Sequence, residues 1–370
     1  MTHKLKKWCL LTIAVIILPI AANADDSGSC GKNVTYYFDE KTHTLTISGE
    51  GPMETNPWIK NSKDIEIIII NEGVTSICDM AFYGCSNITS VNVPNSIKDI
   101  YFSAFSGCSK LSSFTIPSSV RNLCDGVFSD CTKLKTLIVE EGEEPLNLVL
   151  RSLTLGCFSN AIEEIFLGRD MYVERDEWNQ QYKPFKESQS LRKLSIGKNY
   201  TKIPTDYFYG CTNLTSVTFL DGLLEIGDNS FVNCTNISSL SFPSSLKIIG
   251  TNAFVGCEKI EEIVIPGNVS TIYPWAFSCS NLRTVTIEEG DESLKFEGNK
   301  SIAFVGPIEK INLRRNVECY FSPFSPSTSL NLTIGNKVTT LGGGIFAELT
   351  NGIGVFENGF ILTPKPALKF

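Results

Sequence analysis

Phenylalanine recurs in this chain at a fixed interval of 23 residues. The interval separates Phe82, Phe105 and Phe128, and it returns further along at Phe208, Phe231, Phe254 and Phe277. A fixed period of this size is typical of a solenoid, in which each unit buries its apolar face only by stacking against its neighbours. The fold is therefore predicted to be an array of coils stacked along one axis.

Each interval also contains an apolar phrase of the form Leu-x-x-Val-x-Ile, as in Ile260 to Ile265. The first, fourth and sixth residues of the phrase are predicted to face the interior of the coil, and the third and fifth to face outward. Stacking the coils in parallel repeats this pattern in register. The segments between phrases, such as 249–257, are too short for more than one or two helical turns, so turns, short strands and 3₁₀ pieces are predicted on the convex side.

The beginning of the chain predicts export. Residues 1–24 combine a lysine-rich start, an apolar run and small residues that end at Ala24, which is the pattern of a signal peptide cleaved after Ala24. An uncleaved anchor helix is the alternative, although the apolar run is short and contains Pro19. Because no second apolar run of membrane-spanning length follows, the mature chain is expected to be secreted or held at the cell surface without a membrane span.

The remaining chain divides into three parts. Two short β-rich runs in residues 25–60 predict a β-hairpin that caps the first coil, because the terminal unit of a solenoid must cover an exposed core. About twelve coils are expected over residues 61–350, followed by a tail with several glycines and prolines over 351–370. The period is irregular at 140–200 and at 288–335, where insertions are predicted to form loops on one side.

The two irregular regions resemble each other in sequence. The letters IEEIFLGRD of residues 162–170 correspond to IEKINLRRN of residues 308–316. The array is therefore predicted to contain a duplicated block with a longer period than the single coil. Insertions at 140–150 and 169–183 belong to the first copy of this block, and both are predicted to be loops.

The repeat unit resembles that of the BspA-type leucine-rich repeat family, exported proteins of anaerobic, host-associated microbes. The unit I-x-x-x-A-F-x-x-C-x-x-L-x-x-V-x-I-P is nearly intact at 100–117 and 249–266, and the stretch SGSCG…LTISGEGPM precedes the repeats. The resemblance covers roughly residues 27–350. It implies a horseshoe-like leucine-rich repeat solenoid that is mainly β, with one parallel strand per coil. It also implies a secreted or surface protein that binds or adheres to host matrix or to other cells, with no catalytic residues to carry over.

The charge and histidine content exclude several function classes. The net charge is -8 without a cluster of Lys and Arg, so nucleic acid is not an expected partner. His43 is the only histidine of the sequence beyond the predicted signal peptide, and it lies in the predicted cap. It is expected to be a polar turn residue rather than a catalytic base. Glu163 and Glu164 are adjacent on one strand, whereas a glycosidase needs carboxylates that face each other across a sugar. We therefore expect that the protein is not an enzyme and that it uses no cofactor.

Seven cysteines share one slot of the repeat: Cys85, Cys108, Cys131, Cys211, Cys234, Cys257 and Cys279. Export permits disulfides, but equivalent positions in adjacent coils stack at about 4.8 Å, and such a ladder is typical of small buried hydrophobes. Buried free thiols are therefore favoured over disulfides, with pairing more open at Cys78 and Cys124. A metal site is not expected, because there is no C-x-x-C pair and almost no histidine.

The outward positions of the strands carry the main functional information. They are mostly Ser and Thr in regular coils but change character in the first irregular region. The predicted binding face consists of Ile138, Glu164, Phe166, Lys193, Thr218 and Ser241. Solenoids commonly bind through extended faces of this kind, and exposed apolar side chains at 138 and 166 favour contact with a partner. A plain solvated sheet is the alternative.

Two functions remain open from the sequence. The leading hypothesis is an exported, non-enzymatic protein that mediates adhesion or binds a protein ligand, such as a host-matrix or cell-surface protein. The alternative is a structural or carbohydrate-associated surface module. Aromatic platforms that stack on sugars would support the alternative, but Trp58, Trp178 and Trp275 are scattered along the sequence rather than aligned.

Overall fold

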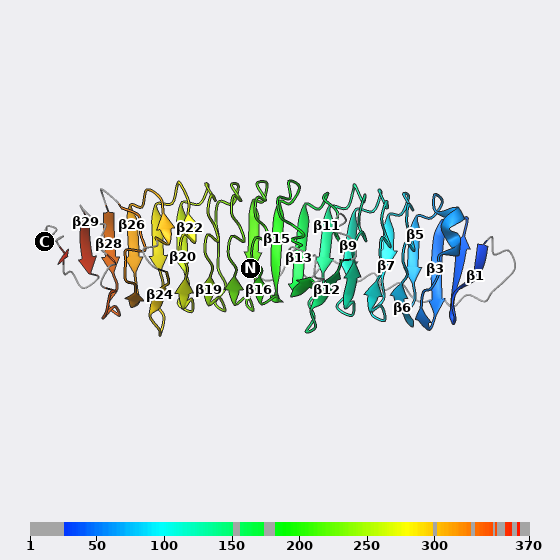
Figure 1. The fold of residues 1–370 in the computed structure, drawn as a ribbon, viewed down its shortest axis with the longest axis horizontal. Helices are drawn as coiled ribbons and strands as arrows, with labels where there is room; N and C mark the ends of the chain where they lie inside the picture. Colours follow the sequence, from blue (N-terminus) through cyan, green and yellow to red (C-terminus); the bar gives the residue numbers. More distant parts are fainter. Residues whose placement is uncertain are drawn as a thin grey trace.

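The computed structural model shows one elongated, mainly β array of stacked coils, as the 23-residue period predicts (Figure 1). It describes residues 26–150, 156–173, 182–298, 302–326, 330–342 and 345, together with the backbone of 352–356 and 361–362. The predicted signal peptide, 1–24, lies outside the described residues, and so do Trp178 and much of the predicted tail. The coils follow one another along the long axis in the order of the sequence.

One side of the array carries the strands of the apolar phrase in three consecutive sheets. The first sheet contains β1 (Asp26–Gly31), β2 (Val34–Asp39), β3 (Thr44–Gly49), β5 (Ile67–Ile70) and β7 (Ser90–Asn92). The second contains β9 (Ser113–Ile116), β11 (Thr136–Val139), β13 (Glu164–Arg169), β15 (Lys193–Asn199) and β17 (Ser216–Phe219). The third contains β20 (Glu262–Ile265), β23 (Thr284–Ile287), β26 (Lys310–Leu313), β28 (Leu330–Ile334), β29 (Gly352–Phe356) and β30 (Ile361–Leu362).

A second side carries shorter strands in two sheets. Their first sheet contains β4 (Gly51–Pro52), β6 (Val74–Ile77), β8 (Asp99–Ile100), β10 (Asn122–Cys124), β12 (Leu146–Val149) and β14 (Met171–Val173). Their second contains β16 (Lys202–Ile203), β18 (Glu225–Ile226), β19 (Ile248–Ile249), β21 (Thr271–Ile272), β24 (Leu294–Phe296) and β27 (Val317–Glu318). Turns, the 3₁₀ helix η1 (Pro57–Asn61) and the pair β22 (Phe277–Ser278) and β25 (Phe304–Val305) complete the described coils.

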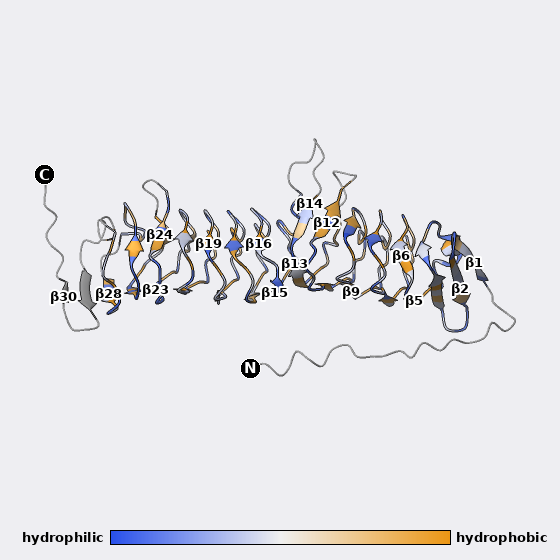
Figure 2. Ribbon diagram, turned by 90° about the horizontal axis from the view of Figure 1, so that it is seen from below, coloured by the Kyte–Doolittle hydropathy of each residue, from blue (hydrophilic) through white to orange (hydrophobic). Residues whose placement is uncertain are grey.

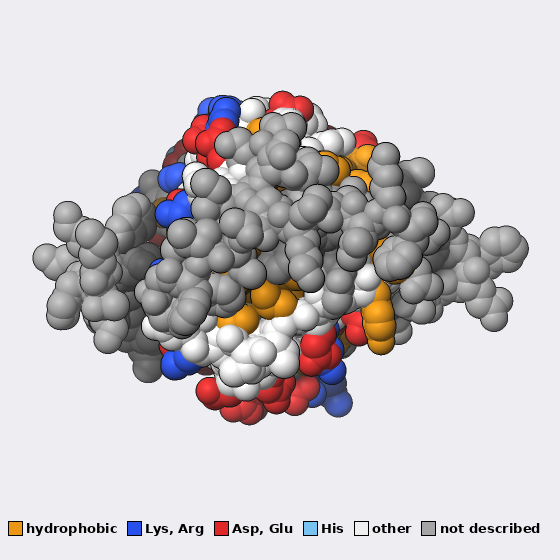
Figure 3. Space-filling view, turned by 90° about the vertical axis from the view of Figure 1, so that its left-hand side faces the viewer, with side chains coloured by type: hydrophobic (Ala, Val, Ile, Leu, Met, Phe, Trp, Pro, Cys, Tyr) orange, Lys and Arg blue, Asp and Glu red, His pale blue; other side chains and the backbone are white. Residues whose placement is uncertain are grey.

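The stack is nearly straight in both side views, rather than curved like a horseshoe (Figures 1 and 2). Strands in neighbouring coils lie about 4.8 Å apart, whereas a helix with its side chains is about 10 Å wide. An array bends when wide elements stack on one side and strands on the other. Here both sides carry strands, so the two sides have nearly equal length and the expected horseshoe-like curvature is absent. Seen from its C-terminal end, the array shows acidic and basic side chains at its periphery (Figure 3).

The core contains a ladder of stacked aromatic rings in two runs, one from Trp58 to Phe128 and one from Phe158 to Phe324. Phe254 is fully buried, and its ring lies 5.2 Å from that of Phe231 and 5.3 Å from that of Phe277. Trp58 begins the ladder, because its ring stacks on Phe82 at 5.7 Å and its indole N–H donates to the carbonyl of Ala81. The predicted role of the periodic phenylalanines is thus confirmed. The first, fourth and sixth residues of the strand phrase are buried beside the ladder in most coils, as predicted, whereas Val91, Val93, Val217 and Leu240 are only partly buried.

The repeated cysteines form a second ladder beside the rings. The thiol of Cys234 donates to the carbonyl of Phe208 at 3.2 Å, and the thiol of Cys257 to that of Phe231 at 3.3 Å. The same bond to the preceding coil recurs at Cys108, Cys131, Cys211 and Cys279. Cysteine suits this slot because it is small and apolar yet supplies a weak donor to a buried carbonyl. All cysteines of the described residues are buried, and the seven of the shared repeat slot carry free thiols.

We expect all twelve described cysteines to react with a thiol reagent after unfolding under non-reducing conditions, and very few in the native protein. Burial raises the pKa of Cys85, Cys211 and Cys279 to about 12, so the folded thiols carry almost no reactive thiolate at neutral pH. Counting labels by mass spectrometry, with and without guanidinium, tests this. Unfolded chains whose ladder cysteines take no label would show that these cysteines are oxidised.

The raised pKa values of the buried thiols also predict how the free energy of unfolding depends on pH. The contribution of the neutral thiols is fully present below about pH 8.5, the pKa of a thiol in the unfolded chain, and is lost as the pH rises toward the folded-state pKa values.

Antiparallel strands close both ends of the array. The predicted hairpin is formed by β2 and β3, and β1 adds a further antiparallel strand that the sequence did not predict. His43 lies in the turn before β3 with a φ of 53°, as expected of a polar turn residue. At the other end, β29 pairs in parallel with β28, and β30 then pairs antiparallel to β29. Part of the predicted tail, 351–370, therefore continues the third sheet.

The insertion at 140–150 is not simply a loop. Its residues Leu146 to Val149 form β12, which pairs in parallel with β10 and β14. Leu146 and Leu148 are fully buried, so the alternation of a strand is present in this segment. The insertion at 169–183 likewise begins with β14, and its residues 174–181 lie outside the described residues. Where the chain is described, the expectation of a loop is confirmed for 140–145 and wrong for Leu146–Val149 and Met171–Val173, which form the second strands of their coils.

Candidate binding face

The second sheet of the strand side brings five of the six predicted residues together. Ile138 pairs in register with Phe166, which pairs with Ser195 and, through it, with Thr218. Two residues before Phe166 on β13, Glu164 pairs in register with Lys193 of β15. Two outward rows therefore cross β11, β13, β15 and β17 side by side, as the alternation along the strands predicts.

The two apolar residues of these rows differ in exposure. Ile138 is 36% exposed, in agreement with the prediction. Phe166 is only partly exposed, because its ring lies against Gly197 of the next strand, where an added Cβ would come within 3.0 Å of its Cζ. The expectation of a freely exposed Phe166 is thus wrong.

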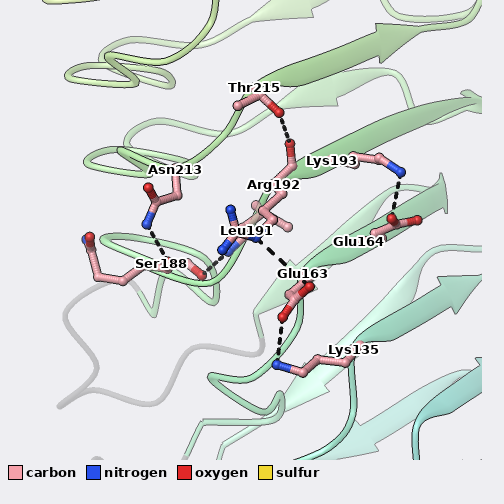
Figure 4. Close-up of polar contacts among 10 residues, drawn as sticks. Lys135, Glu163, Glu164, Ser188, Leu191, Arg192, Lys193, Asn213 and Thr215 are labelled. Atoms are coloured by element: carbon pink, nitrogen blue, oxygen red, sulfur yellow. Dashed lines mark hydrogen bonds and ion pairs between the residues drawn. The ribbon is translucent and has the colours of Figure 1, made fainter.

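Ion pairs lie beside these apolar residues, at the starts of the same strands, and Figure 4 shows the residues that form them. The Lys193 ammonium lies 2.7 Å from Glu164 Oε1, with both side chains about half exposed. On the adjoining edge, Lys135 lies 2.7 Å and Arg192 4.0 Å from Glu163. The hydrogen bond from Lys135 lowers the pKa of Glu163, helped by the charge of Arg192. The two adjacent glutamates thus engage separate cations and do not face each other.

The sixth predicted residue lies outside this sheet. Ser241 is exposed, but its segment, 237–242, forms no strand, and the second sheet ends at β17 while the third begins at β20. Serines rather than β-branched residues occupy the outward positions Ser238, Ser239 and Ser241, so this phrase has weak strand propensity. The predicted face is therefore shorter than expected and ends at Thr218.

The sequence of the repeats matches the description "BspA type Leucine rich repeat region" in six copies, over residues 58–167 and 181–302. These residues make up more than half of the chain. The chain belongs to the BspA-type leucine-rich repeat family. No curated protein matches it in sequence.

Several solved structures resemble this BspA-type leucine-rich repeat chain at low sequence identity. A leucine-rich repeat protein from Bacteroides ovatus is 20% identical, with 88% of this chain and 90% of that chain covered and a TM-score of 0.42. A leucine rich cell surface protein from Faecalibacterium prausnitzii is 18% identical, with 72% and 90% covered and a TM-score of 0.30. The pneumococcal vaccine antigen PcpA is 14% identical, with 84% and 96% covered and a TM-score of 0.34.

A buried arginine holds the end of β13, one strand of the candidate face of this leucine-rich repeat protein. Arg169, at the end of β13, is 1% exposed. Its Nη1 donates to the carbonyls of Ser118 and Glu144 at 2.8 and 3.2 Å, and its Nη2 to that of Pro117 at 2.9 Å. The guanidinium thereby ties the end of β13 to the turn after β9 and to the insertion before β12. Sequence reasoning missed this residue.

The second irregular region repeats the same device. Arg315 is 2% exposed, and its guanidinium donates to the carbonyls of Gly267 and Pro266 at 2.5 and 3.1 Å. Burial lowers its pKa to about 10, so it remains charged at neutral pH. The ion pair of Arg283 with Glu309 corresponds to that of Lys135 with Glu163. The contacts therefore support the predicted duplicated block, and the arginine shared by the aligned letters RD and RN was a signal that could have singled out Arg169 and Arg315.

The described residues contain no group of three or more His, Cys, Asp or Glu side chains arranged to hold a metal ion. No helix among them is long and apolar enough to cross a membrane. What the face offers chemically is an apolar pair, Ile138 and Phe166, beside a row of paired charges.

Proposed function

We propose that this protein is an exported, non-enzymatic binding protein that engages a protein ligand at the cell surface through the face formed by β11, β13, β15 and β17. The observation that carries the proposal is the apolar pair of Ile138 and Phe166 in one outward row, beside the ion pair of Glu164 with Lys193. Elsewhere on the regular coils these positions hold mostly small hydroxyl side chains.

The architecture favours a broad partner over a small molecule at this face. The inward positions of its strands are filled by buried aliphatic side chains such as Ile165, Leu194 and Ile196. The four strands that form the face, at about 4.8 Å each, span roughly 15–20 Å along the array, an open sheet surface on which a protein ligand can lie. Binding hot spots favour aromatic and charged anchors in such a setting. A matrix or cell-surface protein of the host is the partner class that this surface fits.

Replacing Phe166 and Lys193 together by alanine is expected to weaken capture of a protein ligand at least about tenfold, because it removes the aromatic anchor and one charge of the row of paired charges. The melting curve should change little, since both side chains are at least partly exposed. Surface-based binding to a panel of purified extracellular-matrix proteins, with the full mature chain, measures this.

The matched control replaces Ser113 and Thr115 of β9 by alanine. These residues lie in the same two rows, across β11, but offer only hydroxyl groups. Their replacement should leave capture unchanged. Normal capture by the Phe166 and Lys193 variant, combined with loss of capture when residues 174–181 are shortened, would show that the sheet face is not the site.

A further inference from the structure

Two exposed aromatic residues stand where neighbouring coils have small or polar ones. On the second side of the array, Ile226, Ile249 and Ile272 pair in register. The residues that follow by one and by three are Gly227 and Asn229, then Gly250 and Asn252, then Tyr273 and Trp275. Tyr273 is 38% and Trp275 is 42% exposed. The coil of β21 therefore presents two aromatic side chains to solvent at a corner where the preceding coils present none.

The backbone of Trp275 is unfavourable for its side chain. Its φ is 59°, in the left-handed region that asparagine tolerates and that a bulky residue rarely adopts. In the preceding coils Asn229 and Asn252 have the same sign of φ and are joined by a side-chain hydrogen bond of 3.0 Å. Tryptophan interrupts this series at a cost in strain and gains little burial. Strain at an exposed position is a reason to look for a function.

The next two coils extend the aromatic patch. β21 pairs with β24 as far as Ile272 and Phe296, and β24 pairs with β27 as far as Lys295 and Glu318. Continued beyond these pairs, the same register brings Tyr273, Glu297 and Tyr320 into one row. Tyr320 is 89% exposed. A hollow of about 470 Å³ opens here, lined by Lys295, Phe296, Glu297, Glu318, Cys319, Tyr320 and Gly342. Exposed rings thus flank a hollow that carries both carboxylates and an ammonium.

We propose that Tyr273, Trp275, Glu297 and Tyr320 form a binding site for an extended β-1,4-linked oligosaccharide. A pyranose ring has an apolar face of C–H groups, which stacks on an aromatic ring, and a rim of hydroxyls, which hydrogen-bond to carboxylates and amines. The exposed rings supply the first kind of contact, and Lys295, Glu297 and the phenol of Tyr320 supply the second. A protein partner needs a larger contact, typically about 800 Å² on each side, whereas this patch is narrow and interrupted by charges.

The spacing of the rings favours a β-1,4 linkage. Tyr273 and Tyr320 are separated by two strand intervals, which corresponds to roughly 10 Å along the array. In an extended β-1,4-linked chain successive sugars turn over, so every second sugar presents the same face at about this repeat. An α-1,4-linked chain coils and does not keep that repeat. A straight array of coils and a straight glycan can therefore stay in register over several sugars.

The test is calorimetric titration of the full mature chain with cellohexaose, N-acetylchitohexaose and, as the α-linked comparison, maltohexaose. Binding of at least one β-1,4-linked probe is expected, with little or no binding of maltohexaose. Replacing Trp275 by asparagine and Tyr320 by alanine together should weaken that binding by about tenfold or more. Because Trp275→Asn restores the residue type of the preceding coils, the melting temperature of this single variant should be unchanged or higher, so loss of binding cannot be assigned to misfolding.

The control variant is Tyr83→Ser, which removes a tyrosine of 50% exposure from an early coil and should leave glycan binding unchanged. Three results would each overturn the proposal: no binding of either β-1,4-linked probe, equal binding of maltohexaose, or full binding by the Trp275→Asn and Tyr320→Ala variant. Because the site lies on the second side of the array, capture of a protein ligand through the face of Ile138 and Phe166 is measured independently, and either proposal can fail without the other.

Discussion

Replacing Phe254 by alanine is expected to lower the free energy of unfolding by about 3–5 kcal/mol. The ring is fully buried and stacks between Phe231 and Phe277. Alanine would leave a cavity between two coils whose strands are fixed in register, so the surrounding chain cannot close it. Denaturant titration measures the loss, and hydrogen exchange should show the greatest loosening in the adjacent coils, because stability in such an array is shared between nearest neighbours.

Ser239→Ala in the preceding coil is the matched control. Its side chain is exposed, and its replacement should change the free energy of unfolding by no more than about 0.5 kcal/mol. A loss below about 1 kcal/mol for Phe254→Ala would mean that the ring is not part of the packed core, and the ladder would then not be what holds the coils together.

Replacing Arg169 by leucine is expected to destabilise the protein by about 3 kcal/mol, because one buried and two partly buried carbonyls lose a charged donor at once. Relief from burying the charge offsets part of the loss, since burial also lowers the pKa of this arginine. The effect should concentrate around β12 and the turn after β9, which the guanidinium connects. Denaturant titration and hydrogen exchange of these segments measure it.

Arg121→Leu provides the comparison, because Arg121 is exposed and its replacement should be nearly neutral. Arg169→Lys should fall between the two, since an ammonium keeps the charge but lacks the fork that reaches several carbonyls. A neutral effect of Arg169→Leu would mean that water or backbone donors satisfy these carbonyls equally well.

The repeat architecture was predictable because each regular coil packs against a coil of nearly the same sequence. A residue at one slot stacks on its own kind, so the spacing of Phe231, Phe254 and Phe277 sufficed to place them in one ladder. The shared slot of the cysteines predicted buried thiols for the same reason. The straightness of the array was not predicted, because it depends on which elements form the side opposite the strands of the apolar phrase. The strands on that side, such as β18 and β19, are only two residues long, so the sequence pattern did not reveal them.

The candidate face was predicted in its location but not in its detail. Alternation along β13 correctly placed Glu164 and Phe166 outward. The partial burial of Phe166 depends on Gly197, a residue of another coil whose missing side chain makes room for the ring. The role of Arg169 likewise depends on carbonyls two coils back, near Pro117, which no local pattern reveals. The prediction of the face assumed that every coil makes the same contacts as its neighbours. Coils that contact an insertion do not, so their details could not be predicted from the repeat.

The antiparallel strands at the two ends have a consequence for self-association. An open end of stacked parallel strands leaves a row of unpaired N–H and C=O groups onto which another copy of the array can add, and a straight array would then lengthen into a fibre. At one end this edge is β1, which contains an irregularity between Ser29 and Gly31. At the other it is β30, only two residues long. A bulged edge and a very short edge both discourage further pairing, so these two strands oppose the end-to-end addition of another copy.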